Sequence, residues 1–209
     1  MEFTFPVEIY SRLAKLTRII PADDKGDLRG VLLERKNNET YAVASNRRIA
    51  AIYYLGKTVG EDGIIQITND EALIAQCDKE AAFSATLQVV AIPALKMATI
   101  KTIYGYQYPG NAALPEVDNR LAAWRDLTDY KPAASSHGAM AWTTDEIMAL
   151  SASSMSGHIV FPEIIDVRKP IYVRDLKYPE WVGVFMGSRK DDSGRSTIAE
   201  PSTIPTWWK

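Results

Sequence analysis

The 209-residue sequence contains a single cysteine, Cys77, so it can form neither an intramolecular disulfide nor a multi-cysteine zinc site. It has only two histidines, His137 and His158, and neither has a metal-ligand partner at helical or hairpin spacing. It also lacks a G-x-S-x-G nucleophile motif, a phosphate-binding G-x-x-x-x-G-K loop and an H-E-x-x-H motif. We therefore expect no catalytic residues, no metal site, no cofactor and no enzyme activity.

One group of charged residues could indicate a catalytic site. Glu163, Asp166 and Lys169 have the side chains of a metal-nuclease centre. Two carboxylates and a lysine occur together by chance in most chains, however, and prolines at 162 and 170 bracket these three residues. A hydrolase therefore remains a third alternative, behind two binding functions.

Long hydrophobic runs are also absent. No stretch approaches the roughly 18 consecutive apolar residues that a membrane-spanning helix requires. The first ten residues lack the basic n-region and apolar core of a secretory signal, so we expect a cytoplasmic protein without membrane contact. The net charge of −2 provides no global field that would attract nucleic acid, so any such contact requires a local basic patch.

A basic patch is present on the first predicted helix. Apolar residues recur between Val7 and Ile20 at spacings of four, three and four, which predicts an amphipathic helix. Arg12, Lys15 and Arg18 fall on the opposite side of this helix. They could form an ordinary solvated face, or a face that contacts DNA phosphates, because sequence-independent DNA binding needs little beyond cations.

The rest of the chain alternates between strands and short helices. Oxygen-bearing caps followed by acidic residues predict helices from Asp70 to about Lys79 and from about Thr144 to Ser153. Glu116 to Leu127 is predicted as either a helix or an irregular cover. Strands are predicted at Glu2–Phe5, Gly30–Arg35, Thr40–Ala44, Arg48–Leu55, Ile64–Ile67, Phe83–Ile92, Lys96–Tyr108, Ile159–Ile165 and Pro170–Arg174. The expected class is α+β.

Residues 41–56, YAVASNRRIAAIYYLG, consist of two strand-like apolar runs separated by a short polar interruption. The interruption contains the adjacent arginines Arg47 and Arg48. It is either a solvated turn or a surface that a partner recognises.

The C-terminal region also has two interpretations. Residues 187–203 have the composition of a flexible tail, but Trp207 and Trp208 follow them. Adjacent exposed tryptophans suit a peptide anchor, because aromatic residues dominate interface hot spots. Alternatively, the tail folds back and covers the core of its own chain.

Several segments resemble bacterial DNA sliding clamps, the DNA polymerase III β subunit family. MEFTFP with the following YSRLAKLTR resembles the first strand and pore-facing helix of the middle clamp domain, and IIQITNDEALIAQC resembles the strand and second helix of the same domain. RGVLLERKNNETYAVASNRRIA resembles the hairpin that leads into a T-D-G-H-R-L-A motif, and LKYPEWVGVF resembles the F-P-D-Y turn. The likeness covers about the first 110 residues well and the remainder patchily.

The resemblance implies units of a helix backed by antiparallel β-sheet, which assemble into a ring around duplex DNA. It gives Arg12, Lys15 and Arg18 the role of contacting the phosphate backbone. It places Arg47, Arg48 and Ile49 beside a pocket that captures peptides of a polymerase or another replication protein. Ser45 and Asn46 replace the family's Asp-Gly, and Arg47 replaces its His, so this pocket is expected to be altered. Asn46 could adopt the left-handed conformation that glycine supplies.

The resemblance also suggests a domain arrangement. Residues 1–129 are expected to form a clamp-like domain of two units, residues 130–186 a partial second one, and residues 187–209 a tail. Three units per chain would close a twelve-unit ring from four chains, and a fourth unit would favour three chains. The short chain suggests a phage version of the clamp. The alternative is a monomeric clamp-fold adaptor or inhibitor that binds a replication protein through Trp207 and Trp208.

Overall fold

The structure is a computed structural model that describes most of the chain. It describes residues 1–17, 30–46, 49–102, 112–114, 144–161 and 170–185, and singly Val117, Ala122, Trp124 and Arg125. Several residues singled out above lie outside this described part: Arg18, Arg47, Arg48, His137, Glu163, Asp166, Lys169, Trp207 and Trp208.

The described elements follow one another as three helix-plus-strand units. The first unit is β1 (Glu2–Pro6), α1 (Val7–Leu16), β2 (Gly30–Lys36), β3 (Glu39–Ser45) and β4 (Ile49–Lys57). The second is β5 (Gly63–Thr68), α2 (Glu71–Ala81), β6 (Thr86–Ile92), the 3-10 turn η2 (Pro93–Leu95), β7 (Met97–Thr102) and β8 (Ala112–Ala113). The third is α4 (Thr144–Ser153), β9 (Ile159–Val160), β10 (Ile171–Asp175) and β11 (Trp181–Phe185).

The strands of the described residues form two antiparallel sheets. One has the order β1-β6-β7-β8 and the other the order β5-β2-β3-β4-β11-β10-β9. The first two units exchange their leading strands, because β1 pairs with β6 and β5 pairs with β2. The pairing of β4 with β11, in which Ile52 lies opposite Val182, joins the third unit to the first in one seven-stranded sheet.

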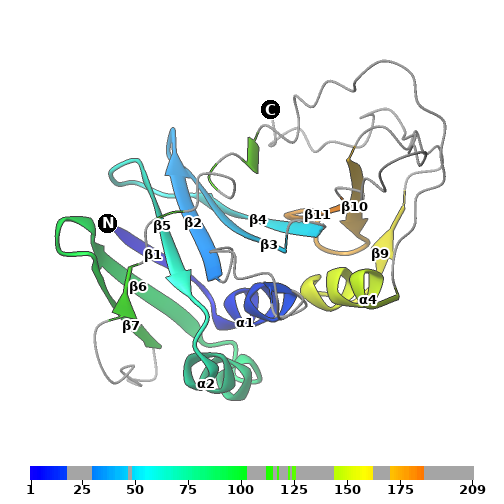
Figure 1. The fold of residues 1–209 in the computed structure, drawn as a ribbon, viewed down its shortest axis with the longest axis horizontal. Helices are drawn as coiled ribbons and strands as arrows, with labels where there is room; N and C mark the ends of the chain where they lie inside the picture. The colour runs from blue at the N-terminus through cyan, green and yellow to red at the C-terminus, as the bar shows by residue number, and fades with distance from the viewer. Residues whose placement is uncertain are drawn as a thin grey trace, which may run out of the picture.

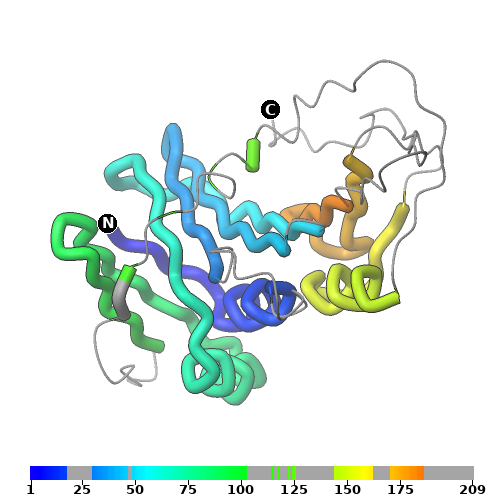
Figure 2. The backbone as a smooth tube through the Cα atoms, in the orientation of Figure 1, coloured from blue at the N-terminus to red at the C-terminus, as the bar shows by residue number. Residues whose placement is uncertain are grey.

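Among the described residues, the helices α2, α1 and α4 lie in a row in that order along one side of the sheets (Figure 1). The tube in Figure 2 shows the same layering, with the β4–β11 junction above the neighbouring ends of α1 and α4. The main hydrophobic core fills the space between the helices and the sheets, and its members include Phe3, Leu13, Leu73, Leu150 and Trp181. Each fully buried side chain of this size contributes about 1.5–3 kcal/mol to stability.

Local sequence signals explain where the helices lie. Ile9, Leu13 and Leu16 are buried, as the helical spacing predicts, and Pro6 directly precedes α1. The carboxylate of Asp70 accepts hydrogen bonds from the backbone N–H groups of Ala72 and Leu73, so it caps α2 as predicted. Cys77 on α2 is buried.

Some predicted boundaries are wrong. β6 begins at Thr86 rather than Phe83, because Ser84 has a φ of 53° and residues 82–84 form a turn that ends α2. β9 extends only over residues 159–160 of the described chain, and β11 was not predicted as a strand. β11 is held by packing: a Cβ atom at Gly183 would lie 2.5 Å from the Trp181 ring and 2.9 Å from Leu150 of α4. Only glycine allows this close approach of helix and sheet.

Candidate functional site

Two of the three proposed DNA-contacting residues lie on α1, on the side opposite its buried residues. Arg12 and Lys15 are the members of this set within the described residues, and their side chains are 27% and 46% exposed. Both are engaged in contacts within the chain, so neither is a free cation in this structure.

Arg12 connects α1 to the end of α4. Its Nε and Nη2 atoms donate to the Glu8 carboxylate one helical turn earlier, at 2.9 and 2.6 Å. Its Nη1 atom donates to the carbonyl oxygens of Ala152 and Ser154, at 3.0 and 2.7 Å. The carbonyl groups at a helix C-terminus lack partners within the helix and carry partial negative charge, so a guanidinium caps them favourably.

Lys15 connects α1 to α2. Its Nζ atom lies 2.7 Å from Oδ1 of Asp78, and the hydroxyl of the buried Ser11 donates to the same oxygen. The ion pair is about half exposed, so it is weak and sensitive to salt.

The charge of the helix row is acidic. The cationic residues of α1, α2 and α4 are Arg12, Lys15 and Lys79. Their acidic residues are Glu8, Glu71, Asp78, Glu80, Asp145 and Glu146. Three cations against six carboxylates give these helices a formal charge of −3, which is unfavourable for long-range attraction of DNA.

The proposed partner-docking segment is built differently from the expectation. Ile49 is fully buried in the main core, where it pairs with Phe185 of β11, so it presents no surface. Asn46 is 5% exposed, and its side-chain oxygen accepts a hydrogen bond from the Ile49 N–H at 2.9 Å. Asn46 is not among the described non-glycine residues with positive φ, so the predicted left-handed conformation is wrong. The side-chain hydrogen bond stabilises the turn instead.

A second cluster, on the opposite face of the seven-stranded sheet, was missed from the sequence. Trp124 is 3% exposed, and its indole N–H donates to the Glu34 carboxylate at 2.7 Å. Arg125 pairs with the same carboxylate at 3.2 Å and lies over the rings of Tyr41 and Trp124, at 4.6 and 4.3 Å from their centroids. Burial, followed by the hydrogen bond to Glu39, raises the pKa of Tyr41.

This outer-face cluster fixes residues 124–125 against strands β2 and β3. Ala122 is helical and Trp124 and Arg125 lie in a 3-10 turn, and apart from these three residues and Val117 the segment 116–127, predicted as either a helix or an irregular cover, lies outside the described residues. A tryptophan next to an arginine in a segment of weak periodicity was the available signal, because this pair can cover an apolar sheet while it engages a carboxylate.

Among the described residues, no group of three or more His, Cys, Asp or Glu side chains could hold a metal ion. His158 is exposed and lies in the loop between α4 and β9. Within the same part of the chain, no helix is long and apolar enough to cross a membrane.

The fold matches solved structures of sliding clamps. A crystal structure of the DNA polymerase sliding clamp from Pseudomonas aeruginosa aligns with a TM-score of 0.58 at 11% identity, over 91% of this chain and 67% of that chain. A putative DNA polymerase III β subunit from Eubacterium rectale aligns at 9% identity, over 91% and 66% of the two chains, with a TM-score of 0.48.

The match to the Pseudomonas aeruginosa structure shows that the chain has the α+β sliding-clamp fold. The chain spans about two thirds of the length of both structures. No protein-family model matches the chain, and no curated protein matches its sequence. Identity this low establishes the fold alone.

Proposed function

We propose that this chain is a clamp-type factor of DNA replication that encircles duplex DNA in a ring with other copies of itself and tethers a partner protein there. The observation that carries this proposal is the row of α2, α1 and α4 along one side of two antiparallel sheets, in the fold of the Pseudomonas aeruginosa sliding clamp. The function is binding rather than catalysis. Three or four chains would complete the ring.

The proposal assigns separate roles to separate surfaces. Arg12, Lys15 and Arg18 contact the phosphate backbone inside the ring. Arg47 and Arg48, which precede the buried Ile49, take part in docking a peptide of a polymerase or another replication protein.

The negative charge of the helices determines how such a ring would hold DNA. The described helices carry a formal charge of −3. Because Glu80 and Glu146 are buried, three cations and four carboxylates remain outside the core, so such a surface gains little from the release of counterions when DNA binds. Retention then depends on enclosure, because a closed ring cannot leave a closed circle whatever the sign of its charge. Binding should consequently depend more on the topology of the DNA than on the salt concentration.

The test compares a closed circular plasmid with the same plasmid after linearisation. The protein is first dissociated at high salt and then diluted in the presence of each DNA, so that rings can reassemble around it. We expect co-elution with circular DNA on gel filtration and loss after linearisation. Equal retention on the two forms, or no retention on either, would overturn the proposal. Replacement of Arg12 and Lys15 by Ala should reduce retention on circles only slightly, because enclosure rather than charge holds the DNA.

A second candidate function is supported by one specific observation. Arg12 and Lys15 are engaged within the chain, and the helix row is acidic, as suits a protein that binds a basic partner instead of DNA. This candidate is a monomeric adaptor or inhibitor that binds a replication protein through Trp207 and Trp208. Deletion of residues 204–209 should then abolish capture of a purified partner polymerase, whereas the ring function predicts that DNA retention survives this deletion.

A further inference from the structure

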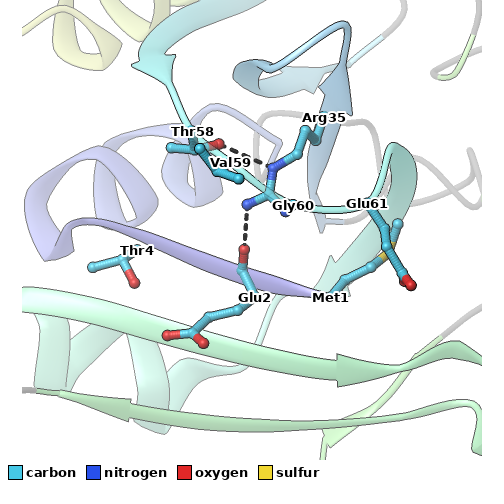
Figure 3. Close-up of a pocket in the computed structure, with 8 residues that line it drawn as sticks. All are labelled: Met1, Glu2, Thr4, Arg35, Thr58, Val59, Gly60 and Glu61. Atoms are coloured by element: carbon cyan, nitrogen blue, oxygen red, sulfur yellow. Dashed lines mark hydrogen bonds between the residues drawn. The ribbon is translucent and has the colours of Figure 1, made fainter.

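A pocket of about 370 Å³ lies between β1 and the loop that follows β4 (Figure 3). Glu2 and Thr4 of β1 form one wall, and residues 58–61 form the other. Arg35, the penultimate residue of β2, lies between these walls. This pocket is separate from the helix row and from the segment around Ile49.

Arg35 is held rigidly. It is 5% exposed, its Nε atom donates to the Thr58 hydroxyl at 2.9 Å, and its Nη2 atom donates to the backbone carbonyl of Glu2 at 2.5 Å. The guanidinium also lies over the Phe3 ring, 5.2 Å from its centroid. A cation fixed by three contacts is preorganised for an incoming anion, because little conformational freedom remains to be lost on binding.

Arg35 has no counter-ion among the described residues. The Glu2 carboxylate accepts a hydrogen bond from the Gln88 side chain instead, and Figure 3 shows the carboxylates of Glu2 and Glu61 directed away from the guanidinium. A buried charge without a partner is unfavourable. The Nη1 atom has no hydrogen-bond partner within the described chain and lies against Gly60, where a Cβ atom would approach it to 2.2 Å.

The pocket runs along the open edge of a β-strand. Met1 and Ala91 exchange backbone hydrogen bonds of 3.0 and 2.8 Å, and the Val7 N–H donates to the Ala85 carbonyl. Odd-numbered residues of β1 therefore direct their N–H and C=O groups towards β6, and even-numbered residues direct theirs outwards. Among the described strands, β1 has no neighbour on that side. The Glu2 carbonyl is bonded to Arg35, which leaves the N–H and C=O of Thr4 for an added strand.

We propose that this pocket binds the C-terminal carboxylate of an extended peptide from a partner protein. The peptide adds to β1 as an antiparallel strand, exchanges backbone hydrogen bonds with Thr4, and ends at the Arg35 guanidinium. Antiparallel addition is required because the chain must run from Thr4 towards Glu2 to bring its terminus to Arg35. Strand addition combined with a charge-assisted carboxylate contact is a general mode of peptide recognition.

Charge complementarity favours a carboxylate over a phosphate. The two acidic residues at the rim, Glu2 and Glu61, would repel a dianion more strongly than a monoanion. The planar carboxylate also matches the remaining donors of the guanidinium fork. The open edge also offers backbone N–H and C=O groups. An extended peptide can pair with these groups, whereas a free anion cannot.

The test titrates the full-length protein, labelled with nitrogen-15, with two peptides. One is the N-acetylated tetrapeptide Thr-Val-Thr-Val with a free C-terminal carboxylate, and the other is its C-terminal amide. We expect the free acid to shift the backbone amide signals of Thr4 and Gly60, and the amide to bind about tenfold more weakly, equivalent to about 1.4 kcal/mol. Equal binding of the two peptides, or shifts at Gly60 without shifts at Thr4, would overturn the proposal.

Variants test the site itself. Arg35→Gln should remove the difference between the two peptides, while Lys101→Gln, an exposed cation on β7, should leave it unchanged. Gly60→Ala provides a second test that retains Arg35, because the added methyl displaces the guanidinium and should weaken binding of the free acid about tenfold. Unchanged discrimination in both Arg35→Gln and Gly60→Ala would contradict the assignment. This inference holds whether or not the chain forms a ring.

Discussion

The guanidinium of Arg12 donates a hydrogen bond to the carbonyl oxygen of Ser154 at 2.7 Å, although the two residues are 142 positions apart in the sequence. The contact joins the first helix of the chain to the end of α4, so a residue expected to contact DNA also stabilises the junction between units. The two roles of Arg12 can be separated by measuring stability and DNA retention in the same variants.

Arg12→Ala should lower the free energy of unfolding by about 1–3 kcal/mol, because it removes charge-assisted hydrogen bonds to two helix-terminal carbonyls and the contact with Glu8. Lys15→Ala is the matched control on the same helix. Its exposed ion pair with Asp78 should contribute less than about 1 kcal/mol. Urea denaturation followed by circular dichroism measures both values. Equal losses would show that the Arg12 contacts contribute no more than a surface ion pair.

The outer-face cluster predicts that the loss of stability depends on how much of the Trp124 side chain is removed. Trp124→Ala should destabilise the protein by about 3–5 kcal/mol, because it leaves a large cavity over the sheet and removes a donor to Glu34. Trp124→Phe retains most of the ring and should cost about 1–2 kcal/mol, mainly from the lost hydrogen bond. Thermal unfolding by calorimetry ranks the variants. A Phe variant as unstable as the Ala variant would contradict the proposed division between packing and hydrogen bonding.

Asp175 predicts a dependence of stability on pH. Burial of its carboxyl raises the pKa, but hydrogen bonds from the Ser156 hydroxyl and from the backbone N–H groups of Ser156, Lys177 and Tyr178 outweigh burial and lower it. A lowered pKa in the folded state means that the carboxylate stabilises the fold above the unfolded-state value of about 3.9. This contribution is lost as the pH falls through the folded-state pKa.

Asp175→Asn should accordingly be less stable than the original protein at pH 7, and the difference should shrink as the pH falls below about 4. Urea midpoints measured between neutral and acidic pH provide the test. A difference independent of pH would show that the carboxylate charge does not stabilise the two loops that it joins.

Cys77 should resist chemical modification in the folded protein. Burial, followed by the nearby charges of Glu80 and Asp78, raises the pKa of its thiol to about 12, and the side chain is fully buried in the core. The thiolate is the reactive form, so iodoacetamide at pH 8 should label Cys77 only after denaturation. Mass spectrometry before and after addition of urea measures the labelling. Rapid stoichiometric labelling of the native protein would contradict this packing of α2.

Local sequence patterns predicted those elements whose signals are local. The helical spacing of Ile9, Leu13 and Leu16 and the Asp70 cap identified α1 and α2. The strands predicted at Gly30–Arg35 and Thr40–Ala44 match the hairpin of β2 and β3. β11 was missed because Gly183 weakens the strand pattern and the preceding proline and glutamate suggested a turn. Its conformation depends on pairing with β4, more than 100 residues earlier in the chain.

The dependence on tertiary contacts also limited the prediction of the sites. Periodicity correctly placed Arg12 and Lys15 on the face of α1 opposite the core, but it could not identify Ser154 or Asp78 as their partners, because both contacts arise from tertiary packing. Arg35 lies in an ordinary strand pattern, and nothing in its neighbourhood in the sequence indicated a pocket. Its environment depends on Glu2 and Thr58, which tertiary structure brings to opposite sides of the guanidinium.

The proposal of a DNA-encircling ring is tested most directly by the mass of the native protein in solution. Light scattering after size exclusion at moderate salt should give three or four times the 23.3 kDa chain mass. A closed assembly of that size is the predicted result. A monomer across a wide range of concentration would contradict the ring and favour the adaptor function.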